Sequence, residues 1–403
     1  MDTLISIKPL LAVLVSLLAI PFIAYSRSPN VREGWTFLAA IVKFGIVAAM
    51  LPAVLNGQEI SCALVEVLPG LSIAFRVDAF GMLFALVASF LWIITSVYSI
   101  GYMRGLDEHA QTRYFCFFAI SLSAAVGVAF SANLLTMYLF YEMLSLATYP
   151  LVTHHQDEEA RTSGRKYLLY TVGASIGLVL PAMLMTYHLT GSLDFSPQGI
   201  LAGTASRGTV ALLLFMFVFG FAKAAIMPFH SWLPAAMVAP TPVSALLHAV
   251  AVVKAGVFTV LKILVYVFGI DLLASTDASR WLTWVAAFTI LAASIVALTK
   301  DNLKARLAYS TVSQLSYIVL GALLATQASI LGGMLHIAMH AFGKITLFFA
   351  AGAILVAAHK TEISDMAGLG RAMPVTFGAF FVASLSMIGL PRFGGMWSKW
   401  YLA

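Results

Sequence analysis

Stretches of about 20 apolar residues recur along almost the whole chain, and they constrain the fold more than any other feature of the sequence. Such a stretch is long enough for one helical crossing of a lipid bilayer. A soluble alternative is excluded by composition, because 61% of the residues are hydrophobic and only 10% are charged. So few charges cannot cover a water-facing surface. The sequence therefore predicts an all-α integral membrane protein.

We expect about twelve transmembrane helices, counting about 20 apolar residues for each crossing. The first stretch lacks a charged n-region and a small-residue cleavage site, so it is predicted to be a span rather than a removed signal peptide. The predicted spans are residues 3–25, 35–55, 79–102, 114–130, 133–153, 167–190, 208–227, 241–268, 281–299, 306–325, 328–357 and 373–403.

Lysine and arginine concentrate in alternate connections between these spans. Connections of the other set hold mainly acidic residues: Glu59, Glu66, Asp194, Asp271 and Asp277. By the positive-inside rule the basic side is cytoplasmic, which places the N-terminus outside. The basic set consists of Arg27, Arg32, Arg104, Arg113, Arg161, Arg165, Lys166, Lys300, Lys304, Arg306, Lys360 and Arg371.

The connections are too short to form a catalytic domain; the longest on the basic side are residues 154–166 and 359–371. No Walker A motif, nucleotide fingerprint or nucleophile elbow occurs, so no catalytic residues are predicted. Cys62 and Cys116 are too few and too far apart for a disulfide framework or a metal site. We therefore predict no cofactor and no metal. The scattered basic residues do not predict nucleic-acid binding. Because the chain has no nucleotide-binding or catalytic motif, the energy for its activity must come from an ion gradient or from a partner protein in the membrane.

Several ionisable residues remain inside the predicted spans, where each costs about 2.5–3.5 kcal/mol at a helix centre. Glu142 is the only acid that we place at mid-membrane depth, so it is the expected partner of a lysine. Lys43, and Lys262 near the end of its span, are assigned structural roles, with Lys262 free to reach the interface. The candidates for function are Glu142, Lys223, His248, Lys254, His336, His340, Lys344 and Lys399.

His336, His340 and Lys344 follow one another at intervals of four residues, which places them on one face of a helix. Imidazole titrates closest to neutral pH, so this stripe suits a proton relay. Hydrogen bonding between helices is the alternative interpretation.

Two predicted spans are interrupted by proline. Pro228 directly follows the end of the seventh span, which contains Lys223, and Pro391 precedes Lys399 within the twelfth. A broken helix frees backbone groups, which are tolerated at membrane depth only beside protein or water. Transporters place ion sites at such breaks. We expect N-terminal helices over 1–112, followed by two related half-channel repeats. The first repeat, over 113–268, contains a broken helix, and the second, over 269–403, is incomplete.

The segment FAKAAIMPFHSWLPAAMVAPTPVSALLHAVAVVKAG resembles the antiporter-like subunits shared by Mrp-type cation/proton antiporters, respiratory complex I and membrane-bound hydrogenases. The segments NLLTMYLFYEMLSLATYPL, DNLKARLAYSTVSQLSYI, LHIAMHAFGKITLFF and GLPRFGGMWSK are similar to family segments in the expected order. The resemblance implies a Glu142–Lys223 pair and a continuing path through the other candidates. It also implies that this chain ends inside the twelfth span of a longer family pattern, and Arg392 stands where the family commonly has a second proline.

The lysine at position 254, the TYPLVTHHQDEEAR segment and the SKW ending are most similar to the D-type subunit of Mrp antiporters. The resemblance implies a proton-translocating subunit that exchanges Na⁺ or K⁺ for protons, works with other membrane subunits and resides in a bacterial inner membrane. The alternative is a proton-pumping subunit of complex I or a membrane-bound hydrogenase, which would make the chain part of a redox enzyme. A third interpretation is a scaffold whose buried charges only hold helices together.

Overall fold

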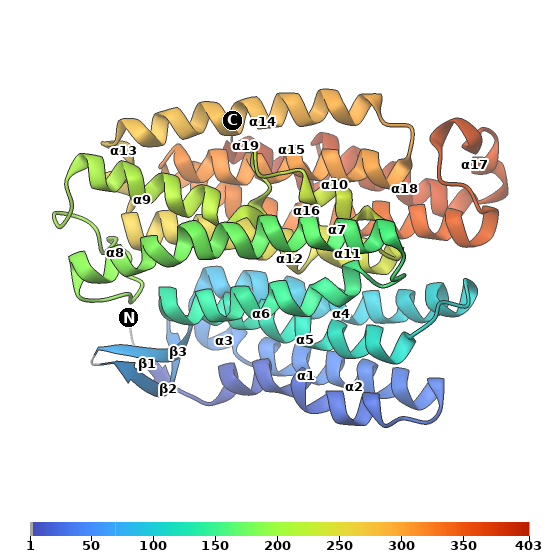
Figure 1. Cartoon of the computed structure of the whole chain (residues 1–403), viewed down its shortest axis with the longest axis horizontal. Helices are drawn as coiled ribbons and strands as arrows, with labels where there is room; N and C mark the ends of the chain where they lie inside the picture. Colours follow the sequence, from blue (N-terminus) through green and yellow to red (C-terminus); the bar gives the residue numbers. More distant parts are fainter. Residues whose placement is uncertain (1–2, 69, 403) are drawn as a thin grey trace.

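The computed structural model describes residues 3–68 and 70–402, and it shows a bundle of helices that run side by side along its long axis (Figure 1). Each of the twelve predicted spans contains helix. Among the described residues, seven helices are long and apolar enough to cross a membrane: Pro29–Leu55, Ala79–Gly105, Gln111–Phe130, Glu158–Thr190, Thr241–Phe268, Asp277–Thr299 and Gln327–Ala358. Shorter apolar helices cover Lys8–Ala24, Arg207–Gly220 and Pro374–Ile388. The prediction of a multi-pass helical membrane protein is confirmed.

The N-terminal third packs as one group of helices at the bottom of Figure 1. Two of these helices start at capping side chains: the carboxylate of Asp78 accepts a hydrogen bond from Gly81 N (2.6 Å), and Asn133 accepts one from Thr136 N (2.8 Å). The elements are α1 (Lys8–Ala24), α2 (Pro29–Ala48), α3 (Leu51–Leu55), α4 (Ala79–Gly105), α5 (Gln111–Phe130) and α6 (Leu134–Val152).

A small three-stranded sheet lies at one end of this group. Strand β1 (Thr3–Ile5) pairs in parallel with β2 (Glu59–Leu68), which pairs antiparallel with β3 (Leu71–Val77). Glu59 and Glu66, predicted to lie in a connection between spans, belong to β2 of this sheet. Strands β2 and β3 are rich in apolar and β-branched residues, which favour extended chain.

The sixth span begins earlier than predicted. Residues 154–166 were expected to be a cytoplasmic loop, but helix α7 (Glu158–Leu168) starts within them. Asp157 caps this helix by accepting a hydrogen bond from Ala160 N (2.7 Å), and two acidic residues occupy the first turn. The helix continues through π-helical turns η1 (Leu169–Gly173) and η2 (Ser175–Val179) into α8 (Leu180–Thr190).

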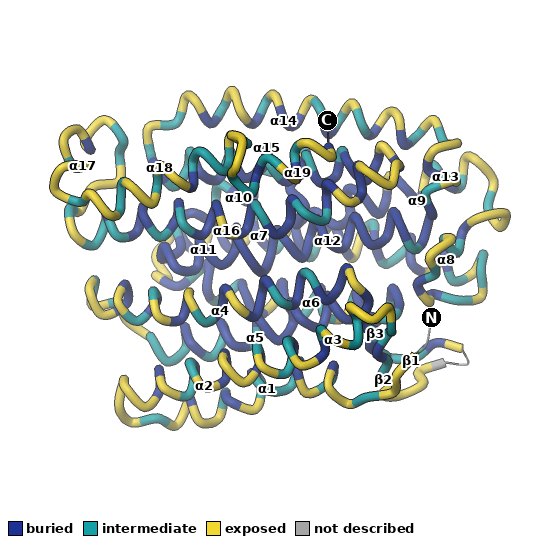
Figure 2. Tube along the Cα trace, turned by 180° about the vertical axis from the view of Figure 1, so that it is seen from behind, coloured by how far each residue is buried: buried dark blue, intermediate teal, exposed yellow. Residues whose placement is uncertain are grey.

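The remaining helices surround α11 (Thr241–Ala249) and α12 (Val252–Ile263), whose residues are all buried. Figure 2 shows this buried centre inside an outer layer of more exposed chain. Large apolar side chains are exposed in that layer, among them Trp284 and Leu298. Lipid is the natural contact for such a layer. The other elements are α9 (Arg207–Gly220), η3 (Ala222–Ala224), α10 (Trp232–Ala235), η4 (Ala236–Val238), η5 (Leu264–Phe268), α13 (Ile270–Ala274), α14 (Asp277–Thr299), α15 (Leu303–Leu323), α16 (Gln327–Ala358), η6 (Ile363–Met366), α17 (Leu369–Ala372), α18 (Pro374–Ile388) and α19 (Gly394–Leu402).

Candidate functional site: a row of buried ionisable side chains

The seventh span is broken, but the break begins before Pro228. Helix α9 ends at Gly220, and Lys223 lies in the short turn η3. Two aromatic side chains take up the freed backbone groups: Tyr141 Oη accepts a hydrogen bond from Lys223 N (3.2 Å), and Trp232 Nε1 donates one to the Ala222 carbonyl (3.0 Å). The prediction that the helix runs to Met227 was wrong, because these side chains stabilise the irregular backbone upstream of the proline.

Lys223 is fully buried against α6. Its Nζ donates hydrogen bonds to the Tyr141 carbonyl (2.8 Å) and to Ser145 Oγ (2.6 Å), and it lies 3.1 Å from the centre of the Tyr141 ring. Glu142 lies on the same turn of α6, where its Oε1 accepts a hydrogen bond from Ser175 Oγ (2.5 Å). Among the described residues, Glu142 forms no ion pair within 4 Å. The structure thus brings Glu142 and Lys223 to one turn without direct contact.

A second break, which the sequence analysis did not predict, separates α11 from α12 at Val250 and Ala251. It lies between His248 and Lys254, and both side chains are fully buried. Neither ring nitrogen of His248 nor Lys254 Nζ makes a hydrogen bond to any described residue. The interrupting residues are apolar, so no proline or glycine signalled the break.

Helix α16 carries the predicted stripe of His336, His340 and Lys344, and all three are buried. The two ring nitrogens of His336 contact Ser398 Oγ (2.9 Å) and Gln314 Oε1 (3.1 Å).

Lys344 Nζ donates to the Leu307 carbonyl (3.1 Å) and to Ser310 Oγ (2.8 Å). His340 has no hydrogen-bond partner in the described part of the chain. The hydroxyl and amide partners on α15 and α19 could not be recognised from the sequence, because only the tertiary fold places them opposite α16.

The third break is the one predicted at Pro391. Helix α18 ends at Ile388 and α19 begins at Gly394. Between them Gly389 (φ 89°) and Arg392 (φ 76°) adopt left-handed backbone conformations. Lys399 Nζ donates to the Met387 carbonyl (2.7 Å), which the end of α18 leaves without a helical partner.

The packing of α16 joins these groups. It contacts α11, α12, α15 and α19, and the ring centres of His336 and His340 lie 5.7 Å apart on it. On the other side, α12 meets the first break at Gly256, where a Cβ atom would lie 2.4 Å from the Lys223 carbonyl carbon. We call the connected set the polar row; its members are Lys223, His248, Lys254, His336, His340, Lys344 and Lys399.

Two buried lysines lie outside the polar row. Lys43 Nζ donates to the Leu122 carbonyl (3.4 Å) and lies over Trp92. Lys262, for which a structural role was predicted and which was free to reach the interface, is instead fully buried and pairs with Asp78 (Nζ to Oδ2, 3.6 Å). The carboxylate that caps α4 provides this ionic partner within the protein.

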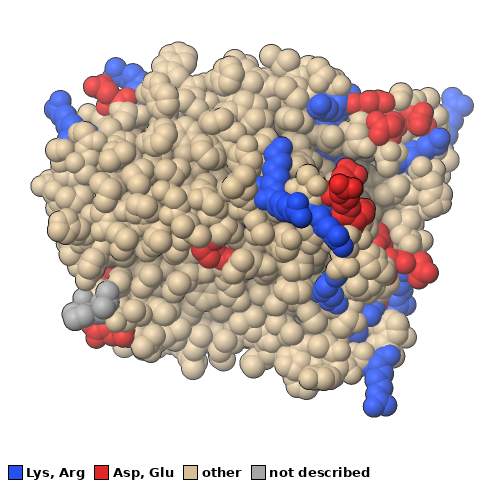
Figure 3. All heavy atoms as spheres, in the orientation of Figure 1, with Lys and Arg blue, Asp and Glu red and all other residues tan. Residues whose placement is uncertain are grey.

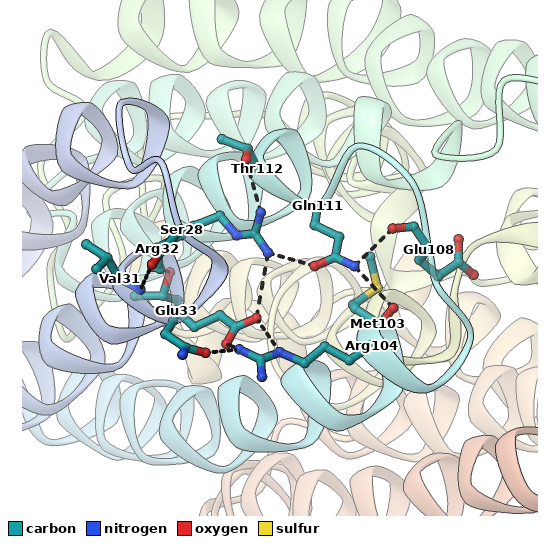
Figure 4. A network of polar contacts seen from close by, with 11 residues as sticks. Ser28, Val31, Arg32, Glu33, Met103, Arg104, Glu108, Gln111 and Thr112 are labelled. Carbon is teal, nitrogen blue, oxygen red and sulfur yellow. Dashed lines mark hydrogen bonds and ion pairs between the residues drawn. The ribbon is translucent and has the colours of Figure 1, made fainter.

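Glu142 is not the only acid within the helices. Glu33 on α2 is buried, and it forms ion pairs with Arg104 and, at 3.6 Å, with Arg32 (Figure 4). These charges lie near helix ends, where the sequence analysis had placed Arg32 and Arg104 in connections. Charge compensation within the protein, rather than exposure to water, is the reason that Glu33 is tolerated there.

One group of described side chains has spacing suited to a metal ion, and it lies outside the polar row. It consists of Glu108, His109 and His154, from the turns after α4 and α6. Burial favours the neutral form of Glu108, but the hydrogen bond from His155 and the charges of His155, His154 and His109 together outweigh this effect and lower the pKa of Glu108 below its ordinary value.

Two family models match the chain. One, described as "NADH:quinone oxidoreductase/Mrp antiporter, TM", matches residues 131–403. The other, described as "NADH-Ubiquinone oxidoreductase (complex I), chain 5 N-terminus", matches residues 70–115.

Curated relatives include both antiporter and oxidoreductase subunits. The chain is 33% identical over 375 residues to NADH-quinone oxidoreductase subunit L of Mycobacterium tuberculosis, covering 90% of this chain and 57% of that protein. It is 31% identical over 369 residues to the A/B-type subunit of a probable K(+)/H(+) antiporter of Rhizobium meliloti, and the match covers 89% of this chain and 36% of that protein. The identity to NAD(P)H-quinone oxidoreductase chain 5 of Picosynechococcus sp. is 32%, and the match covers 82% of this chain and 50% of that protein. The chain thus spans about half the length of the first curated relatives it matches.

Two solved structures share the fold. A chain of the archaeal membrane-bound sulfane sulfur reductase superimposes with a TM-score of 0.89 at 24% identity, covering 98% of this chain and 81% of that one. A chain of the Mrp complex from Dietzia sp. DQ12-45-1b superimposes with a TM-score of 0.86 at 24% identity, covering 98% of this chain and 73% of that one. The resemblance stated from the sequence motifs is confirmed, and the chain belongs to the NADH:quinone oxidoreductase/Mrp antiporter family of membrane subunits.

Proposed function

We propose that this chain translocates protons along the polar row, as a subunit of a Na⁺ or K⁺/proton antiporter. The observation that carries the proposal is the group around the second break: His248, Lys254 and His340 are buried and have no hydrogen-bond partner among the described residues. A lysine at the centre of a span costs about 2.5–3.5 kcal/mol. Side chains that only held helices together would be expected to be paired.

The helix breaks can give the unpaired buried side chains access to water. Irregular backbone at membrane depth is compatible with water, and the second break lies directly between His248 and Lys254. Water at this point would connect side chains that are not in direct contact. Lys344 and Lys399 would continue the path on the far side of α16.

We propose that Glu142 controls the first step. In this structure Lys223 is held by the Tyr141 carbonyl and Ser145, while Glu142 is held by Ser175. A rotation of Glu142 toward Lys223 would stabilise the protonated amine, and a return to Ser175 would remove that stabilisation. The proton would then move toward His248 and Lys254.

The same proposal includes the organisation of the chain. Residues 1–112 would form a supporting group of helices, 113–268 a first half-channel repeat and 269–403 an incomplete second one. On the face in Figure 3, lysine and arginine gather toward one end of the bundle. This segregation supports the proposed orientation, with the N-terminus outside and the basic end in the cytoplasm of a bacterium.

The second candidate is a proton-pumping subunit of an NADH-quinone oxidoreductase or a related redox complex. It is favoured by the identity to subunit L and to chain 5. Assignment to the D type among Mrp subunits remains a prediction from the sequence. Neighbouring genes distinguish the candidates: small antiporter subunits support the first, and flavin or iron–sulfur subunits support the second.

The test is proton transport by the complete assembly in liposomes. Glu142→Gln and Lys223→Ala are each expected to abolish proton-coupled transport. Lys43→Met is the matched control, because Lys43 is also a buried lysine but lies outside the polar row. Normal transport in both variants, with altered assembly instead, would support a scaffold and contradict the proposal.

A further inference from the structure

Four metal-ligating side chains meet where two turns approach each other at one end of the bundle. Glu108 and His109 lie in the turn between α4 and α5, and His154 and His155 in the turn between α6 and α7. One ligand atom each from Glu108, His109 and His154 lie within 4.8 Å of one another. None of these residues belongs to the polar row.

The Glu108 carboxylate lies between two imidazoles. Its Oε2 is 3.7 Å from His154 Nε2, and its Oε1 is 3.4 Å from His155 Nε2. The ring of His109 closes the group, with its centre 4.8 Å from that of His154. Three imidazoles and one carboxylate are the donors found in zinc sites.

His154 is the observation that points to a ligand. Its side chain is completely buried, and neither ring nitrogen makes a hydrogen bond to any described residue. A buried imidazole normally has partners for both nitrogens. The Glu108 carboxylate, whose Oε2 lies 3.7 Å from His154 Nε2, is beyond hydrogen-bond distance. An ion between them would provide His154 with a partner.

The two turns are held in place by the start of α5. Gln111 Nε2 donates to the carbonyl oxygens of Met103 (3.2 Å) and Glu108 (3.0 Å), and Gln111 Oε1 accepts from Arg32 (2.6 Å) (Figure 4). Within the turn, Asp107 has a left-handed backbone (φ 49°). These contacts fix the backbone that presents Glu108.

The second turn is fixed in the same way, because Arg113 Nη2 donates to the His154 carbonyl (2.8 Å). Arg113 therefore directs its charge at the backbone of the turn. Supporting hydrogen bonds of this kind position the ligands of metal sites.

We propose that this cluster binds one divalent transition-metal ion, with Zn²⁺ as the best match, through Glu108, His109 and His154. In a tetrahedral site with bonds of about 2.0–2.1 Å, ligand atoms lie about 3.4 Å apart. The Glu108 contacts are already near that spacing, and the exposed His109 side chain closes the remaining gap by rotation. His155 or water takes the fourth position. The bound ion links the α4–α5 turn to the α6–α7 turn.

Sequence motifs could not reveal this site. Its ligands come in adjacent pairs from turns separated by the whole of α5 and α6, and adjacent residues do not form a helical or CxxC-type pattern.

The test uses the full chain purified in detergent, stripped with a chelator and titrated with Zn²⁺ alone. We expect one Zn²⁺ per chain, a higher Tm with Zn²⁺, and a tetrahedral Co²⁺ absorption spectrum on substitution. His109→Ala and Glu108→Gln are each expected to weaken binding by more than the roughly 10–100-fold that loss of an outer-shell partner causes. The matched control is His188→Ala, an exposed histidine outside the cluster.

His109 is exposed, so its variant tests binding even if changes at the buried His154 prevent folding. Absence of stoichiometric Zn²⁺ from the wild-type chain would overturn the proposal. Binding that is unchanged in both His109→Ala and Glu108→Gln would do the same. Either result would leave His154, His155 and Glu108 as a simple ionic cluster.

Discussion

Gly256 is the point at which α12 meets the first helix break, and Gly256→Ala tests how closely they are packed. A Cβ atom there would lie 2.4 Å from the Lys223 carbonyl carbon and 2.5 Å from Ala224 N. Both are backbone atoms, so no side-chain rotation can relieve the overlap. Overpacking of this kind costs about 1–3 kcal/mol, and Gly→Ala in a helix gains up to about 1 kcal/mol.

Gly101→Ala in α4 is the matched control, because no heavy atom lies within 4 Å of a Cβ at this helical position. The gain in helix propensity is common to both variants. The difference between their free energies of unfolding therefore measures the overpacking, and we expect Gly256→Ala to be less stable by about 1–3 kcal/mol. Reversible denaturation in detergent measures it. A difference below about 0.5 kcal/mol would refute the close contact between α12 and the Lys223 turn.

Two further predictions concern buried partners. Tyr141→Phe removes the acceptor for Lys223 N. Leaving that N–H unsatisfied should lower the free energy of unfolding by about 1–3 kcal/mol. Equal stability of the variant and the wild-type protein would show that the Tyr141 hydroxyl is not needed. Lys262→Met leaves Asp78 as an uncompensated buried charge, which should cost about 3–5 kcal/mol. Adding Asp78→Asn should recover part of this loss, and a double-mutant cycle with no coupling would contradict the ion pair.

The spans were predictable because hydropathy depends on local composition. Each predicted span contains helix, and the break at Pro391 lies where proline and glycine placed it. The candidate side chains were predictable for a related reason. An ionisable residue inside an apolar run is conspicuous in the sequence, and seven of them, from Lys223 to Lys399, lie in the connected polar row.

The helix breaks and ionic partners that could not be predicted from the sequence depend on tertiary contacts. Helix α9 ends at Gly220 because Tyr141 and Trp232 bind the freed backbone, and neither lies in α9. The break at Val250 occurs among residues that are individually compatible with helix. The partner of Lys262 is the capping residue of a helix far away in the sequence. For Lys223 and Lys262 the deciding group lies outside the helix that carries the break or the lysine.

The central claim is that protons move along the polar row, and transport by Lys254→Met tests it most directly. Lys254 is fully buried and has no hydrogen-bond partner among the described residues, so its replacement by an apolar side chain of similar length should preserve packing. In liposomes that contain the complete assembly, we expect Lys254→Met to abolish proton uptake and Lys43→Met to retain it. Uptake by Lys254→Met at the wild-type rate would contradict the account.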